Sequence, residues 1–451
     1  MKIKKLFSVL ILFVMIQLVV PINAFAAKKP ITDENTIIEY INLDWWKDLD
    51  DPILLEYIIK SIQNNQDLKI STLKVEEAKE TKNIQRANEM PMFGVGAIPA
   101  LYKLPGITNS DGLISLPLYA SYELDLFGKN RDKTKSMDKI YEISRLNEKS
   151  AYISVVSAVG STYYNIVKLD KLILLQEEII KDRKQIYDLK KYSNEEGLVS
   201  TADVVKANKA YIKAESEIIE LNKTRERLLN MLAVLMGENP NNSSEFKRIA
   251  YDDLEIKKSI PDSVSSEIIE SRPDYLAAEK MLEKAGLDVR AAKKEFLPSF
   301  NIFGLISFNS TEYYSKMNWT NSLALLGAGA LFPIFTGGRK IANLKLNKNK
   351  YEQAVENYKK TNIKSIQEVN DALCDLKLDN EKYLKTVESL NAEKQDFKYS
   401  DLKYKEGIIS NLDLLQKKES LLVTEELVVT DKIDYFINQI GLYKAIGGAK
   451  I

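Results

Sequence analysis

The sequence lacks histidine altogether, and this absence removes several kinds of chemistry at once. Imidazole acid–base catalysis, His-based triads and His-ligated metal sites are all excluded. Cys374 is the only cysteine, so the chain has no intrachain disulfide and no thiolate cluster. We read it as a small apolar residue on a helix face. Carboxylate pairs such as Asp50-Asp51 are expected on solvated helices when 28% of residues are charged. The sequence therefore predicts no enzyme activity, no cofactor and no metal site.

Excess charge of either sign is also missing. The chain has 451 residues, with 64 basic and 64 acidic side chains and no net charge. A nucleic-acid binder would be basic, so we expect no nucleic-acid partner.

Long apolar runs are missing after the first residues, which have the pattern of a signal peptide. Lys2, Lys4 and Lys5 precede an apolar run of about 15 residues, and Ala24-Phe25-Ala26 fits a small-x-small cleavage site. We predict that residues 1–26 are a signal peptide, cleaved after Ala26, and that the chain is exported. An uncleaved membrane anchor is the alternative, although a span needs about 20 residues. The residue directly after the cleavage site is Ala27 and not a cysteine, so we expect no lipid anchor there.

Most of the remaining chain has apolar residues at helical spacing among Lys and Glu. The segments are about 52–89, 130–195, 200–238, 272–295, 337–406 and 410–447. Two of them approach about 70 residues, which gives a helix roughly 100 Å long. Because they are too charged to cross lipid, we predict long antiparallel coiled coils.

The chain also repeats itself. MPMF at 90–93 corresponds to LPSF at 297–300, FGKNR at 127–131 to FTGGR at 335–339, and GLVSTAD at 197–203 to GIISNLD at 407–413. The shifts of 207, 208 and 210 residues are nearly constant. This indicates an internal duplication, with a first repeat at 27–240, a connector at 241–271 and a second repeat at 272–451.

Each repeat contains two predicted strands, at about 91–104 and 114–126 in the first and at about 297–309 and 321–334 in the second. Apolar and polar residues alternate most clearly over Ile114–Asp125. The strands have the length of tilted strands that cross a bilayer. Soluble hairpins packed on helices are the alternative. Four strands cannot close a membrane barrel, so several copies would have to share one; two, three or four copies remain possible.

These residues resemble a known family. WWKDLDDPILLEYIIKSIQNNQDL at 45–68 and RPDYLAAEKMLEKAGLDVRAAKKEFLPSF at 272–300 are similar to signatures of the TolC-like outer-membrane efflux ducts, the outer-membrane factors of tripartite RND-type efflux pumps. The resemblance implies a mainly α fold with a β-barrel portion. A homotrimer would form a barrel of twelve transmembrane strands, continued by a hollow barrel of helices. Gly128, Gly337 and Gly338 would mark the strand–helix junctions, where glycine avoids a Cβ clash.

The two turns at 197–203 and 407–413 would be the periplasmic tips of the helices, where the resemblance places a gate. It assigns Asp413 to a ring of carboxylates around the pore, with Gln416 at the second, usually acidic, position. It assigns Asp203 and Tyr404 to a latch that holds the entrance closed. The four tip residues that the resemblance associates with adaptor docking are Gly197, Ser200, Gly407 and Ser410. Simple capping of the returning helices by Ser200 and Ser410 is an equally good explanation of these turns.

The resemblance implies a passive channel in the outer membrane with an extension into the periplasm. Its partners would be two further copies, outer-membrane lipid, a periplasmic adaptor protein and an inner-membrane efflux transporter. The alternatives are a coiled-coil scaffold, a type I protein secretion outlet and, less well supported, the adaptor itself. Trp45 and Trp46 are expected to pack in a collar around the helices rather than at a membrane interface.

Overall fold

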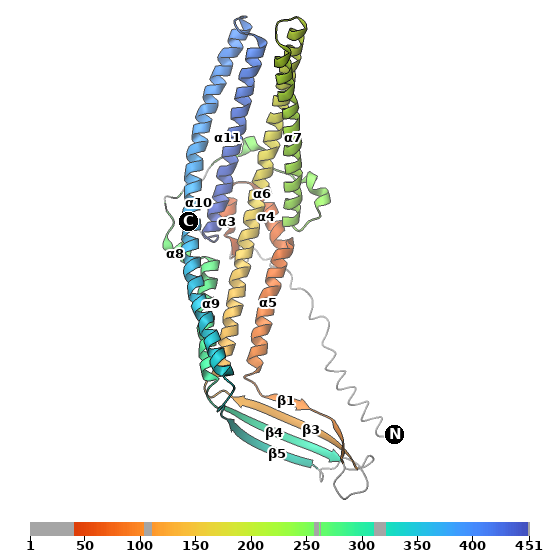
Figure 1. Ribbon diagram of the computed structural model, residues 1–451, viewed down its shortest axis with the longest axis vertical. Helices are drawn as coiled ribbons and strands as arrows, with labels where there is room; N and C mark the ends of the chain where they lie inside the picture. Colours follow the sequence, from red (N-terminus) through yellow and green to blue (C-terminus); the bar gives the residue numbers. More distant parts are fainter. Residues whose placement is uncertain (1–39, 103–110, 257–260, 262, 311–321, 450–451) are drawn as a thin grey trace.

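The computed structural model describes residues 40–102, 111–256, 261, 263–310 and 322–449, so the predicted signal peptide lies outside the described residues. Long helices run along the longest axis, and a twisted sheet lies at one end (Figure 1). Within the described ranges, we find no helix with the length and apolarity needed to cross a bilayer.

The two halves have helices of matching length. Helices α5 (Gln66–Ala87) and α9 (Pro273–Lys294) have 22 residues each, and α7 (Thr201–Leu235) and α11 (Asn411–Ala445) have 35 each. Helices α6 (Lys129–Glu195) and α10 (Arg339–Lys405) have 67 each, or about 100 Å. The prediction of a mainly helical fold with long helices and an internal duplication is confirmed.

The predicted helical segment at about 52–89 is wrong as a single helix. It forms α4 (Pro52–Asn64) and α5, which are separated by Asn65 in an extended conformation. The Asn65 side chain accepts a hydrogen bond from the Leu68 N–H at 3.1 Å and donates one to the Leu235 carbonyl at 2.9 Å. The polar side chain therefore starts a new helix, and its bond to α7 fixes where that helix begins.

The remaining short elements lie beside the long helices. They are α3 (Leu43–Lys47), the 3₁₀ helices η2 (Pro240–Glu245) and η3 (Tyr251–Asp253), and α8 (Ser266–Glu270).

The sheet is antiparallel, in the order β1-β3-β4-β5, with β2 also paired to β3. Its strands are β1 (Met92–Val95), β2 (Ile98–Tyr102), β3 (Asp111–Leu124), β4 (Ser299–Ser310) and β5 (Ser322–Leu331). The first predicted strand, at about 91–104, is thus two short strands in one register. The Gly96 N–H donates to the Pro117 carbonyl at 2.8 Å, but proline has no N–H to return the bond. The ladder is therefore interrupted between β1 and β2.

The main core surrounds the middle of α6, where α3, α4, α7 and α11 meet it. Trp46 is only 1% exposed, and its ring lies 5.1 Å from that of Tyr443, while Trp45 lies 4.6 Å from the same tyrosine. Both tryptophans therefore pack in the core around α6, and their place in a collar around the helical barrel stays a prediction. Cys374 lies on α10 and is exposed.

Candidate functional site

The two helix tips lie at the end of the molecule far from the sheet and share one backbone design (Figure 1). Gly197 and Gly407 have φ angles of 72° and 73°, a left-handed conformation that favours glycine at a helix end. The next residue closes each turn: the Leu198 N–H donates to the Ser193 carbonyl and the Ile408 N–H to the Lys403 carbonyl, both at 2.8 Å.

A serine caps each returning helix. Ser200 and Ser410 each accept a hydrogen bond from the N–H of the aspartate three residues later, both at 3.2 Å. Only Ser410 completes a capping box, because its own N–H also donates to the Asp413 carboxylate at 3.1 Å. The serine hydroxyls hold the pKa of Asp203 and of Asp413 below the usual value, and the positive charge of Lys190 acts in the same direction on both.

Lys190 on α6 is a tip residue that sequence reasoning missed. It lines a cavity of about 270 Å³ between the two hairpins, together with Asp203 and Gln416. The cavity therefore brings together one predicted latch residue and one predicted pore residue. The only sequence signal was a Lys190-Lys191 pair in the last turns of a predicted helix.

The other predicted latch residue, Tyr404, is not joined to Asp203. Tyr404 is 39% exposed, and within the described part of a single chain no hydrogen bond links the two side chains. A latch made by this pair would need a contact between copies of the chain.

The two hairpins are instead joined by ion pairs farther from the tips, here called the inter-hairpin cluster: Asp182, Arg183, Lys418 and Glu419. The Arg183 guanidinium donates to the Glu419 carboxylate at 2.9 Å through Nε, and its Nη2 lies 2.8 Å from the same oxygen. Lys418 donates to Asp182 and to Glu178, both at 3.0 Å. The cluster ties α6 of one hairpin to α11 of the other. Sequence reasoning missed it, since its partners are about 240 residues apart in the sequence.

Asp182 is the most buried member of this cluster, with a side chain that is 3% exposed. Burial raises the pKa of its carboxyl group, and Lys418 opposes that rise. The ionised carboxylate at this position is therefore held by a lysine that only partly offsets the loss of water.

The predicted junction glycines stand directly before the long helices. Gly128 precedes α6 with φ 72°, and Gly337 and Gly338 precede α10 with φ 59° and 78°. Each junction is followed by an arginine, Arg131 or Arg339. Among the described residues of one chain, Arg131 has a carboxylate partner, Asp125, and Arg339 has none.

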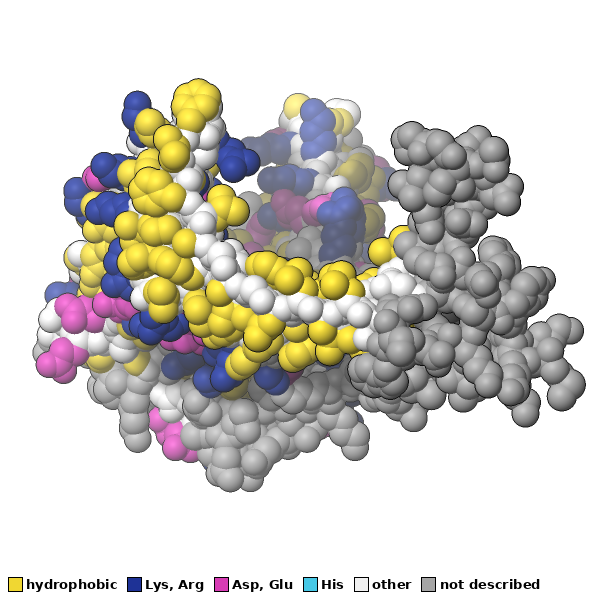
Figure 2. Space-filling model, turned by 90° about the horizontal axis from the view of Figure 1, so that it is seen from below, with side chains coloured by type: hydrophobic (Ala, Val, Ile, Leu, Met, Phe, Trp, Pro, Cys, Tyr) yellow, Lys and Arg dark blue, Asp and Glu magenta, His cyan; other side chains and the backbone are white. Residues whose placement is uncertain are grey.

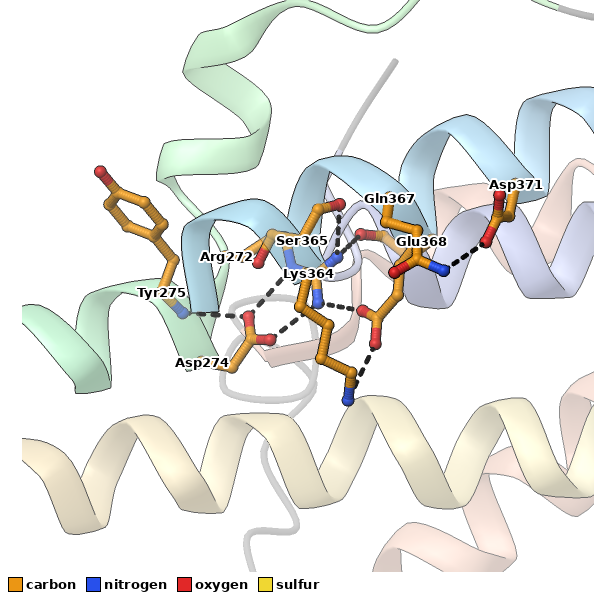
Figure 3. A network of polar contacts seen from close by, with 9 residues as sticks. Arg272, Asp274, Tyr275, Lys364, Ser365, Gln367, Glu368 and Asp371 are labelled. Carbon is orange, nitrogen blue, oxygen red and sulfur yellow. Dashed lines mark hydrogen bonds and ion pairs between the residues drawn. The ribbon is translucent and has the colours of Figure 1, made fainter. Parts of the chain in front are cut away.

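A buried arginine at the start of α9 joins this helix to α10 and to the end of α11 (Figure 3). Arg272, 5% exposed, donates through Nη1 to the Ala445 carbonyl at the end of α11, at 2.6 Å. Its Nε and Nη2 donate to Asp274 at 2.9 and 2.7 Å, and Nη2 also donates to Glu368 of α10 at 2.5 Å. The sequence offered this arginine only as part of the RPD signature, without a role.

Comparison with known proteins decides the family. The sequence pattern of the family described as "Outer membrane efflux protein" matches residues 58–238 and 264–448. The chain belongs to this family. It is an outer-membrane channel component of efflux pumps and not an enzyme, so the resemblance is confirmed and the scaffold and adaptor alternatives are removed.

The most similar relatives cover nearly the whole chain. It is 28% identical over 412 residues to "Probable efflux pump outer membrane protein TtgC" of Pseudomonas putida, covering 90% of this chain and 84% of that protein. It is 26% identical over 422 residues to "Cation efflux system protein CusC" of Escherichia coli, covering 92% and 90%. The crystal structure of the Campylobacter jejuni CmeC outer membrane channel superimposes with a TM-score of 0.83 at 25% identity, covering 91% of this chain and 88% of that chain.

Proposed function

We propose that three copies of this chain form one passive export duct, with twelve strands closed into a barrel in the outer membrane and the helices extending into the periplasm. The observation that carries this proposal is the sheet, whose edges at β1/β2 and at β5 pair with no other strand among the described residues. Open edges are not tolerated in lipid. Joining β5 of one copy to β1/β2 of the next removes every edge.

The two faces of the sheet suit a membrane barrel. The strand register places Leu116, Leu118 and Ala120 on one face with Phe308, Ile306 and Gly304 opposite them. The other face has Ser115, whose hydroxyl lies 2.7 Å from that of Ser307. Seen from the sheet end, hydrophobic side chains run along the sheet (Figure 2). Over β3 and β4 the apolar face fits lipid and the face with Ser115 and Ser307 fits the lumen, whereas β5 has leucines on both faces.

The helices at the two sides of the chain also expose apolar side chains in a single copy. Val205, Ile212 and Ile219 are exposed at seven-residue intervals on α7, and Ile363 and Leu384 are exposed on α10. The two helices lie on opposite sides of the chain (Figure 1). In a closed ring, α7 of one copy would meet α10 of the next and bury these seams.

We place the gate at the tips. Three copies of Asp413 would ring the narrow entrance, where carboxylates attract cations and resist anions. Gln416 leaves this ring with about half the charge of a ring with two acidic positions, so cation selectivity would be weak. Asp203 and Tyr404 would form the latch between copies. The tip residues Gly197, Ser200, Gly407 and Ser410 would dock a periplasmic adaptor, which connects to an inner-membrane transporter.

The cargo stays open between two classes named for relatives. One is called a toluene efflux pump protein and another a cation efflux system protein. We propose that this chain conducts small molecules or ions of this kind; secretion of polypeptides through a type I system is the alternative. We also propose that residues 1–26 direct the chain to export.

The test begins with the mass of the detergent-purified protein and its conductance in planar bilayers. A trimer that conducts supports the duct, while a monomer that stays soluble without detergent overturns it. For the gate, Asp413→Ala is expected to lower the preference for cations, measured as a shift of the reversal potential in a salt gradient. Glu356→Ala, which removes an exposed carboxylate of α10 far from the tip, is the matched control and is expected to leave the reversal potential unchanged. An unchanged potential in Asp413→Ala refutes the pore assignment.

A further inference from the structure

The second strand–helix junction exposes large apolar side chains next to cations. Phe332, Ile334 and Phe335 are 63%, 90% and 89% exposed. Arg339, which is also exposed, is the first residue of α10 and follows Phe335 after three residues. We call these four residues the Arg339 patch. Lys345 and Lys348 are also exposed in the next turns of α10. Figure 2 shows Lys and Arg side chains beside hydrophobic ones where the sheet joins the helices.

Arg339, the cation of the patch, lacks the kind of partner that its counterpart in the first half has. At the first junction, Arg131 pairs with Asp125, and Lys129 donates to Glu123 at 2.6 Å. Arg339 occupies the position equivalent to Arg131, and the first turn of α10 contains no acidic residue. Within the described residues of one chain, Arg339 has no side-chain hydrogen bond or ion pair.

A cavity of about 560 Å³ opens beside Arg339 between the two junctions. Its three carboxylates already have partners: Glu123 accepts from Lys129, Asp125 from the backbone N–H of Arg131, and Glu295 from Lys133 at 3.0 Å. The guanidinium of Arg339 is thus the charged group of the cavity that is left to bind something else. The apolar side chains beside it make a membrane surface a better occupant than a soluble anion.

We propose that the Arg339 patch binds the head group of an anionic phospholipid in the periplasmic leaflet of the outer membrane. The inference rests on the proposed membrane placement of the sheet. Phe332, Ile334 and Phe335 enter the boundary between head groups and acyl chains, and the planar guanidinium takes two phosphate oxygens. Side chains on a helix lean toward its N-terminus, so Lys345 and Lys348 lean toward the same leaflet and add attraction.

The test measures which lipid the full-length protein retains. The protein is extracted from vesicles with equal amounts of phosphatidylglycerol and phosphatidylcholine, and the bound lipids are counted by native mass spectrometry. The wild type is expected to be enriched in phosphatidylglycerol, and Arg339→Gln is expected to reduce that enrichment about fivefold, the effect of one cation near a charged leaflet. Arg131→Gln is the matched control, because Arg131 already has an acidic partner, and is expected to leave the enrichment unchanged.

Three results would overturn the inference. They are a wild type that retains both lipids equally, an Arg339→Gln variant with undiminished enrichment, and loss of the enrichment when inorganic phosphate is added at constant ionic strength, which would indicate a general anion site. If Arg339→Gln does not assemble, Arg339→Lys and the wild-type measurement still decide, because Arg339→Lys keeps the charge but loses the contact to two phosphate oxygens and is expected to lower the enrichment below that of the wild type without abolishing it. Normal conductance without lipid preference defeats only this inference, whereas absence of a conducting trimer defeats the proposed duct.

Discussion

The two halves of the chain use different side chains to bind the end of the 35-residue helix at the start of the 22-residue helix. Asn65 and Arg272 are the N-cap residues of the matched helices α5 and α9, and both are buried. Each donates a side-chain hydrogen bond to the carbonyl of the last residue of its 35-residue helix, Asn65 to Leu235 at 2.9 Å and Arg272 to Ala445 at 2.6 Å.

The shared bond has a physical reason, because the last carbonyls of a helix have no partner within it and must find one when they are buried. The amide of Asn65 also caps its own helix through the Leu68 N–H, whereas Arg272 makes no side-chain cap. The guanidinium needs Asp274 and Glu368 to balance its charge, and through Glu368 it reaches α10 as well. The comparison teaches that the duplication kept the geometry of this joint while the residue that makes it changed.

Replacing each residue of this pair tests that equivalence and is expected to give the largest effect. Arg272→Ala is expected to lower the free energy of unfolding by about 3 kcal/mol, since it removes the buried guanidinium and leaves the Ala445 carbonyl and the carboxylates of Asp274 and Glu368 without its hydrogen bonds. Asn65→Ala is expected to cost about 2 kcal/mol, the loss of a cap and a buried hydrogen bond. Urea unfolding followed by tryptophan fluorescence measures both, because Trp45 and Trp46 pack beside Tyr443 near the end of α11. Equal, small losses of unfolding free energy in the two variants would show that neither hydrogen bond stabilises this joint.

A second experiment compares α6 with α10 at one pair of equivalent positions. Asp182 is buried in α6, while the equivalent residue of α10, Ala392, is exposed. Because burial raises the pKa of Asp182, its contribution to stability is present at low pH and is lost as the pH rises through that raised pKa. The charges around it are Lys418, Glu178 and Lys181.

Asp182→Asn removes this titration. The wild type is therefore expected to gain stability relative to Asp182→Asn as the pH falls from about 7 to about 4, and the variant is expected to be at least as stable as the wild type near neutral pH. Urea midpoints across that range measure the difference. Parallel pH profiles for the two proteins would contradict the assigned pKa direction.

The smallest expected effect separates the two tips. Ser410→Ala is expected to destabilise its helix end by about 1 kcal/mol, and Ser200→Ala by less, because only Ser410 completes a capping box. Hydrogen exchange of the first-turn amides of α11 and α7 measures both. Equal exchange rates in the two variants would show that the second bond of the box adds nothing.

The sequence predicted the parts of the fold that depend on local pattern. Helical spacing located the long helices, and the repeated motifs revealed the duplication. The break at Asn65 was missed, although its N-cap chemistry was visible, because a bond to Leu235 fixes it. The interruption between β1 and β2 was missed because its cause, Pro117, lies on the neighbouring strand.

The candidate site was also predicted only where it depends on local sequence pattern or on the family resemblance. Turn motifs located the tips, and the family resemblance supplied roles for Asp413 and Asp203. The inter-hairpin cluster could not be predicted, because Arg183 meets Glu419 only when the relative register of two distant helices is known. The partners of Tyr404 and Arg339 could not be predicted from one chain, because we place them in other molecules.

The equal lengths of the paired helices restrict how this molecule can change in size. Each hairpin joins a 67-residue helix to a 35-residue helix, and both hairpins start from the same sheet. Inserting one heptad into a single hairpin would extend its tip by about 10 Å beyond the other. A longer or shorter version of this protein therefore requires coordinated insertions or deletions in all four helices, and single indels there are expected to be tolerated poorly.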